Sequence, residues 1–179
     1  MSAKPRPAAF LDRDGTLVEE VNYLSRVEDL RVFPFTLEAL TLLKDAGYLI
    51  VVVTNQSGIG RGIYSEEAMH SIHRQMDIEL PGLIDAYHFC PHLPDAGCAC
   101  RKPGTGMFES ADSRFAIDRS VSWMVGDKVL DIEAGVNAGT HSALVKTGYG
   151  ASTARKMVNA PDIIGEDLLD VVKQIVAKA

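Results

Sequence analysis

Short apolar runs alternate with helix-like segments along most of the chain, and this alternation constrains the fold more than any other feature of the sequence. We expect strands at residues 8–12, 48–55, 84–90, 121–127 and 141–148, and helices at residues 36–47, 65–80, 106–117, 130–139 and 166–179. The run YLIVVVTN is rich in β-branched residues and lacks polar alternation, which is typical of a strand buried on both faces. Strands that alternate with helices predict an α/β fold with a doubly wound, mostly parallel sheet. Thr36 is the expected N-cap of the first helix.

Length and charge narrow the class of protein. The 179 residues suit one domain, residues 1–179, because no repeat or linker divides them. A net charge of -6 argues against a nucleic-acid partner. No apolar run reaches the roughly 18 residues of a membrane span, and the N-terminal segment lacks the apolar stretch of a signal peptide. We therefore expect a cytoplasmic protein with neither a nucleic-acid nor a membrane partner. A monomer is the default expectation for its oligomeric state.

Polar residues follow three of the predicted strands. Asp12 and Asp14 stand at the end of the first strand, Thr54 stands near the end of the second, and Asp127 stands at the end of the strand at residues 121–127. Because ligands of such sheets gather beyond the carboxyl ends of the strands, we expect these side chains to meet. Clustered carboxylates repel one another unless a cation neutralises them, and Mg²⁺ prefers such oxygen ligands. Thr54 and Lys102 could hold the oxygens of a phosphate, and an aspartate can act as a nucleophile toward phosphorus.

Four motifs in this order resemble those of the haloacid dehalogenase (HAD) superfamily of phosphohydrolases: DRDGT, VVVTN, the lysine of RKPG, and GDKVLD. The resemblance implies a HAD Rossmann-like core in which Asp12 is the nucleophile and Asp14 the general acid and base. Thr54 and Lys102 would orient and neutralise the phosphoryl group. Asp12, Asp127 and the backbone oxygen of Asp14 would hold Mg²⁺. Only short inserts follow the first and third strands, so we expect an open site without a large cap domain.

The mechanism that this resemblance implies has two steps. Asp12 attacks phosphorus while Asp14 protonates the leaving alcohol, which gives an aspartyl-phosphate. Asp14 then activates a water molecule that hydrolyses this intermediate. Positioning and charge neutralisation of the transferring group supply the catalysis.

A closer resemblance covers roughly residues 8–150. The stretches DRDGTLVEEVNYL, VVVTNQSGIGRG, CACRKPGTGM and WMVGDK resemble a family of heptose bisphosphate phosphatases. These enzymes remove the C7 phosphate of D-glycero-D-manno-heptose 1,7-bisphosphate during the synthesis of ADP-heptose, a lipopolysaccharide precursor. The resemblance implies a small phosphorylated sugar as substrate. The residues that it assigns to substrate binding are Glu20, Val21, Asn22, Tyr23, Thr54, Asn55, Gln56, Ser57, Arg101, Lys102 and Lys128.

All three cysteines lie in one irregular loop. Cys90, His92, Cys98 and Cys100 follow the pattern C-x-H-x5-C-x-C, which matches a closed tetrahedral site for a structural Zn²⁺. In the cytoplasm such cysteines seldom form disulfides. The alternative is three buried free thiols and a surface histidine. A zinc-clipped loop would fix the approach of Arg101 and Lys102, which follow directly.

Two other functions remain open. Histidinol-phosphate phosphatases share DRDGT, TNQ and a loop that begins CPHLP, whereas EEVNYL and QSGIGRG favour the heptose enzymes. The second alternative is a non-catalytic, zinc-stabilised interaction module, against which the presence of both Asp12 and Asp14 argues.

Asp131 has two interpretations: it orders metal-bound water or Lys128, or it is an exposed helix acid. His70 and His73 are expected at solvated or rim positions of their helix.

Overall fold

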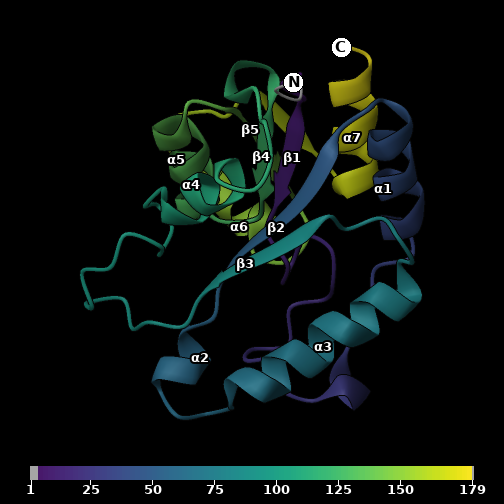
Figure 1. The fold of residues 1–179 in the computed structure, drawn as a ribbon. Coiled ribbons are helices and arrows are strands. Elements are labelled where there is room, and N and C mark those ends of the chain that lie inside the picture. Colours follow the sequence, from purple (N-terminus) through teal and green to yellow (C-terminus); the bar gives the residue numbers. More distant parts are fainter. Residues whose placement is uncertain (1–3, 179) are drawn as a thin grey trace.

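Six parallel strands form one sheet in the computed structural model, which describes residues 4–178 (Figure 1). The strands are β1 (Ala8–Leu11), β2 (Leu49–Asn55), β3 (Ala86–Cys90), β4 (Trp123–Gly126), β5 (His141–Val145) and β6 (Ile163–Gly165). Their order is β3-β2-β1-β4-β5-β6. The predicted α/β fold with a doubly wound parallel sheet is confirmed.

The sheet has a topological switch point between β1 and β4. The chain builds outward from β1 to β3 on one side, then returns to β4, beside β1, and builds outward on the other side. Leu11 is level with Val52 on β2 and with Val125 on β4, so these three strands end at the same edge. Ligands of doubly wound sheets bind at such a point. The polar residues that follow β1, β2 and β4 are therefore delivered to one place.

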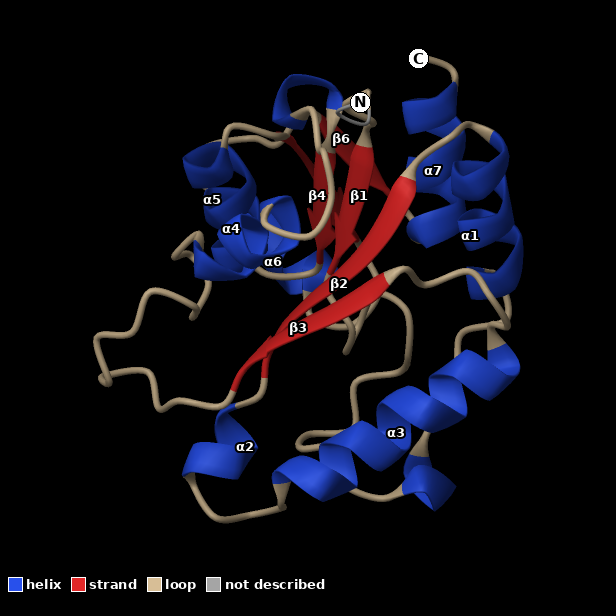
Figure 2. Ribbon diagram, in the orientation of Figure 1, coloured by secondary structure: helices blue, strands red, loops and turns tan. Residues whose placement is uncertain are grey.

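Helices cover both faces of the sheet. They are α1 (Thr36–Asp45), α2 (Ser57–Gly60), α3 (Glu66–Glu79), α4 (Gly106–Asp112), α5 (Val129–Ala138), α6 (Gly150–Lys156) and α7 (Leu168–Val176), with 3₁₀ turns at Val27–Asp29 and Arg119–Val121. Helices α1 and α7 lie on one side of the sheet, and α4 and α5 lie on the other (Figure 2). No helix within residues 4–178 is long and apolar enough to cross a membrane.

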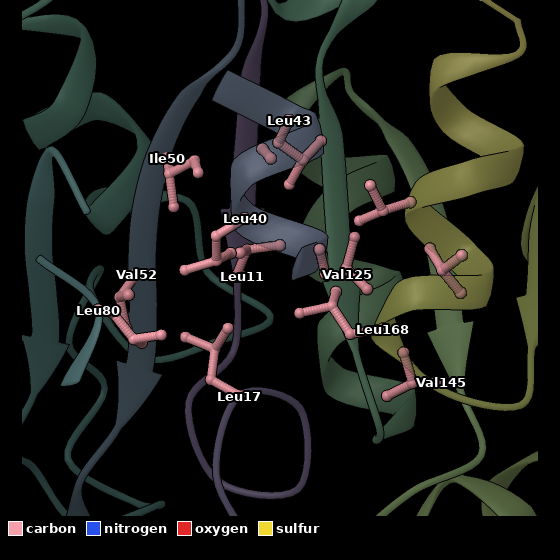
Figure 3. Close-up of a cluster of buried hydrophobic side chains, with 14 of the residues drawn as sticks. Leu11, Leu17, Leu40, Leu43, Ile50, Val52, Leu80, Val125, Val145 and Leu168 are labelled. Atoms are coloured by element: carbon pink, nitrogen blue, oxygen red, sulfur yellow. The ribbon is translucent and has the colours of Figure 1, made fainter. Parts of the chain in front are cut away.

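Alternate residues of β1, β2 and β4 contribute to two hydrophobic cores, as expected for strands buried on both faces. Leu11 packs with Leu40 of α1 and Leu168 of α7 in the core that Figure 3 shows. Its neighbour Phe10 points the opposite way, with its ring centroid 4.6 Å from that of Phe108 on α4. Residues Leu49 to Thr54 are all buried, which confirms the prediction for this run.

Two local predictions are corrected by the structure. Phe35, not Thr36, is the N-cap of α1, because the buried Thr36 hydroxyl donates a hydrogen bond to the Leu17 carbonyl at 2.8 Å. That bond ties the segment after β1 to the helix. Helix α4 ends at Asp112 rather than near residue 117, because residues 116–118 pair with the chain at Arg6.

Candidate active site

The turn after β1 brings two acidic residues to the switch point. The backbone N–H of Asp12 donates to the Val125 carbonyl at 2.9 Å, which continues the pairing of β1 with β4 by one residue. Gly15 then adopts a φ of +81°, and a β-carbon there would lie 2.3 Å from an Asp127 carboxylate oxygen. Only glycine lets the backbone turn this closely past the carboxylate. The glycine of the DRDGT motif is therefore required for steric reasons.

Three buried carboxylates gather at this point. Asp12, Asp127 and Asp131 each offer an oxygen, and these oxygens all lie within 4.8 Å of one another. Burial, together with the charges of the other two carboxylates, raises the pKa of Asp127 to about 8. Its Oδ2 accepts from the Tyr149 N–H at 2.8 Å, whereas its buried Oδ1 has no hydrogen-bond partner. A divalent cation would satisfy that oxygen and the excess negative charge, so this cluster fits Mg²⁺.

This geometry settles the open interpretation of Asp131. The side chain is buried rather than exposed, and its Oδ2 accepts from the Lys128 N–H at 3.0 Å. Burial raises the pKa of Asp131, against the opposing effect of Lys102. Asp14 differs, because its side chain lies outside the carboxylate cluster; the expected metal contact through its backbone oxygen stays a prediction.

Lys102 is the buried counter-charge of the cluster. Its ammonium contacts Asp12 Oδ1 at 2.9 Å, Asp131 Oδ1 at 2.7 Å and the Val53 carbonyl at 2.8 Å. Burial alone would lower the pKa of Lys102, but the two carboxylates outweigh it and raise that pKa. Asn55 fixes the backbone of Lys102 through bonds of 3.2 and 3.0 Å to its C=O and N–H. Lys102 is therefore held charged, with three acceptors for its three donors.

Asp14 is held at the cavity by an arginine that the sequence analysis did not single out. Arg13, which is fully buried, donates from Nε to Asp14 Oδ2 and from Nη2 to Oδ1, each at 3.1 Å. The Gln56 amide donates to Asp14 Oδ2 at 3.0 Å and to the Thr54 hydroxyl at 2.7 Å. The expectation for His73 is wrong, because it is buried and its ring accepts from Arg13 at 3.3 Å.

These residues border a cavity of about 220 Å³. Most residues assigned to catalysis or substrate binding line it: Asp12, Asp14, Glu20, Asn22, Tyr23, Asn55, Gln56, Ser57, Arg101, Lys102 and Lys128. Two do not. Thr54 is buried behind Gln56, and Val21 lines an adjoining groove with Asp29 and Arg31. Most of the residues that line the cavity were therefore predicted from the sequence.

The mouth of the cavity carries a cation between an acid and an aromatic ring. The Lys128 ammonium lies 3.6 Å from a Glu20 carboxylate oxygen and 5.0 Å from the centroid of the Tyr149 ring. Burial lowers the pKa of Lys128, but nearby carboxylates, Asp12 first, outweigh this effect and raise it. Sequence reasoning missed Tyr149, although its position after β5 obeys the same strand-end rule.

Two residues of the cavity lining have left-handed backbone conformations. Asn22 and Tyr23 have φ values of +53° and +66°, which residues other than glycine seldom adopt. Both residues line the cavity. Such strain is concentrated at functional sites, where the surrounding structure holds it in place. Tyr64, which sequence reasoning also missed, lines the cavity too, and its hydroxyl donates to Gln56.

The four residues predicted to bind zinc converge in the loop after β3. Cys90 Sγ lies 3.6 Å from Cys98 Sγ and 3.5 Å from His92 Nδ1, which is 3.3 Å from Cys100 Sγ. A tetrahedron with Zn–S bonds of about 2.3 Å and a Zn–N bond of about 2.0 Å has edges of roughly 3.5–3.8 Å. The sulfur separation is far beyond the roughly 2.05 Å of a disulfide. The donor set and spacing therefore fit a closed, structural Zn²⁺ site.

Known proteins resemble this chain over nearly its whole length. A family model described as HAD-hydrolase-like matches residues 99–171. The chain is 40% identical to D-glycero-D-manno-heptose-1,7-bisphosphate 7-phosphatase of Thermosynechococcus vestitus, over 96% of each chain. It is 37% identical to D-glycero-beta-D-manno-heptose-1,7-bisphosphate 7-phosphatase of Escherichia coli, over 97% of this chain and 95% of the relative.

A solved structure agrees with these relatives. The D,D-heptose 1,7-bisphosphate phosphatase from B. bronchiseptica, complexed with magnesium and phosphate, matches with a TM-score of 0.90 at 33% identity. The match covers 97% of this chain and 99% of that chain. The fold described above is therefore shared with a phosphatase that binds a divalent metal.

We expect Asp127→Asn to stabilise the metal-free protein and to remove its response to Mg²⁺. The substitution keeps the shape of the side chain and removes a carboxyl whose pKa of about 8 makes the folded, metal-free protein bind a proton at neutral pH that the unfolded chain does not bind, which costs stability. The Tm without metal should rise by at least about 2–4 °C, the shift for one kcal/mol in a chain of this length. Added Mg²⁺ should raise the Tm of the unmodified protein and not that of the variant. An equal Mg²⁺ response in both proteins would contradict the site.

We expect one tightly bound zinc per chain that is retained when magnesium is exchanged away. Metal analysis after purification without added zinc measures this directly. Cys98→Ser and Cys100→Ser should each lower the zinc content and the Tm, because a structural zinc contributes folding free energy. A zinc content below about half an equivalent in a protein of normal stability would argue for free thiols instead.

Proposed function

Because the chain belongs to the family of D-glycero-D-manno-heptose-1,7-bisphosphate 7-phosphatases, phosphoric monoester hydrolases of the HAD superfamily, we propose that it hydrolyses the C7 phosphate of this sugar bisphosphate. The products are the heptose 1-phosphate and inorganic phosphate. The observation that carries the proposal is the meeting of Asp12, Asp14, Lys102 and Asp127 at the switch point of the sheet. Asp12 and Asp14 follow β1, Lys102 lies in the loop between β3 and α4, and Asp127 follows β4.

Asp12 is the proposed nucleophile. Lys102 holds its Oδ1, which leaves Oδ2 outside that ion pair and free to form the bond to phosphorus. As that bond forms, the bond from phosphorus to the C7 oxygen breaks. Asp14, at the cavity wall, gives a proton to the departing oxygen, so that the sugar leaves as a neutral alcohol.

The second step returns Asp12 to its carboxylate form. Asp14, now ionised, takes a proton from a water molecule that attacks phosphorus, and the bond between phosphorus and Asp12 breaks. The proton gained by Asp14 replaces the one given in the first step. Mg²⁺ held by Asp12, Asp127 and the backbone oxygen of Asp14 would neutralise negative charge on the transferring group. Thr54, expected to orient the phosphoryl group, is buried and does not line the cavity, so we propose that it acts through Gln56, whose amide donates to the Thr54 hydroxyl.

In this proposal, positively charged side chains at the cavity favour a bisphosphate substrate over a monophosphate that carries an amine. Arg101 and Lys128 line the cavity outside the buried Lys102, where they can bind the phosphate that is retained. Glu20 and Asn22 offer polar groups toward the sugar hydroxyls. Histidinol phosphate carries a primary amine in place of a second phosphate, and a cationic mouth repels it. Specificity then comes partly from an unfavourable contact with the wrong ligand.

We further propose that the reaction belongs to ADP-heptose synthesis, upstream of lipopolysaccharide, and that the enzyme is a cytoplasmic monomer that depends on Mg²⁺. Support for the cytoplasm comes from the cysteines, because all three are arranged as metal ligands rather than as disulfides. Catalytic activity, and not a role as an interaction module, is supported by the presence of both Asp12 and Asp14 at the cavity.

Steady-state kinetics on two substrates test the proposal. The heptose 1,7-bisphosphate should have the higher kcat/KM, and histidinol phosphate the lower one. Arg101→Ala should mainly raise KM for the bisphosphate, with a smaller effect on a monophosphate ester, because the variant loses a contact with the retained phosphate. Arg61→Ala, at an exposed arginine that does not line the cavity, is the matched control. A higher kcat/KM for histidinol phosphate would assign the chain to the alternative activity.

A further inference from the structure

A network of buried side chains connects Asp14 to helix α3. Arg13 is at its centre, with no exposed surface despite its charge. One edge of the guanidinium binds both oxygens of Asp14, and Nη2 also donates to Gln56 Oε1 at 3.2 Å. Nη1 donates to His73 Nε2 at 3.3 Å. The arginine therefore connects the carboxylate at the cavity to a histidine on helix α3.

His73 is suited to accept this hydrogen bond. A guanidinium can only donate, so the contact requires an unprotonated Nε2. Burial first, then the charges of Arg13 and His70, lowers the pKa of His73 to about 3, which keeps the ring neutral. The ring stacks on Tyr87 with centroids 4.3 Å apart and planes 14° apart. The Tyr87 hydroxyl in turn donates to Asp77 at 2.9 Å. The acceptor is thus fixed in both orientation and charge state.

We infer that His73 is a positioning residue that, by holding Arg13, orients the general acid and base Asp14. The inference rests on the proposed function, which gives Asp14 that role. Without an acceptor, Nη1 of Arg13 would be a buried, unsatisfied donor of a charged group, which is costly. The guanidinium would turn toward another acceptor, and Asp14 would move with it. A displacement of about 1 Å at a catalytic group can cost on the order of 10²-fold in rate.

Substrates with different leaving groups distinguish a positioning role of His73 from a role in packing alone. The alkoxide of a sugar is a poor leaving group and needs the proton from Asp14, whereas p-nitrophenolate departs with little help. The value of kcat/KM reports the first phosphoryl transfer, in which the leaving group departs. A misplaced acid therefore lowers kcat/KM for the heptose bisphosphate far more than for p-nitrophenyl phosphate. Loosened packing lowers both values by a similar factor.

The experiment compares His73→Phe and His73→Gln with the unmodified protein on both substrates. We expect the phenylalanine variant, which keeps a ring against Tyr87, to lose at least about tenfold in kcat/KM for the bisphosphate and less than about threefold for the aryl phosphate. The glutamine variant, whose side-chain oxygen can accept from Arg13, should recover most of the loss. His70→Phe, on the partly exposed side of α3, is the control and should change neither value. If His73→Phe does not fold, His73→Leu gives the same comparison.

Two outcomes distinguish failure of this inference from failure of the proposed function. Asp14→Asn, measured in parallel, should show the same selective loss on the bisphosphate. If Asp14→Asn shows it and no His73 variant does, His73 only packs, and the inference is overturned. If Asp14→Asn loses equally on both substrates, or loses nothing, the assigned role of Asp14 fails, and the inference fails with it.

Discussion

The buried ion pair between Lys102 and Asp12 is the interaction on which the rest of the site depends. The same ammonium contacts Asp131, so one cation faces two carboxylates while Asp127 completes the cluster. Three carboxylates and one ammonium leave two negative charges in a buried place, which is the charge that a divalent cation neutralises. Without the cation, a proton on Asp127 supplies part of that neutralisation, in agreement with its raised pKa of about 8.

The sheet and the cysteine loop together place Lys102. The end of β2 fixes its backbone through the two hydrogen bonds of Asn55, and the cysteine cluster ends at Cys100, two residues earlier. Little regular structure orders this loop between β3 and α4. A closed metal site would therefore link the folding of the loop to the position of Lys102, and would also set the position of Arg101 at the cavity. On this account the structural metal influences activity without touching the substrate.

Much of the fold and of the site was predictable, and the failures have physical reasons. Periodicity and β-branched content identified the long strands, and the strand-end rule brought Asp12 and Asp127 together. Helix α2 and strand β6, with four and three residues, are too short to carry a periodic signal. His73 looked like a surface residue because its partner, Arg13, lies 60 positions away in sequence. A polar residue on an amphipathic helix is buried only where a distant partner satisfies it, and one sequence does not show that partner.

The identity of the phosphorylated residue tests the central claim most directly. Rapid acid quenching during turnover, followed by borohydride reduction and mass spectrometry of the peptides, locates an acyl phosphate on the chain. The account predicts the reduced label on Asp12, and its absence in Asp12→Asn. It predicts that Asp14 and Asp127, which lie beside Asp12 in the same site, stay unlabelled. A label on either of them, or turnover with no label at any carboxylate, would contradict the assignment of Asp12 as the nucleophile.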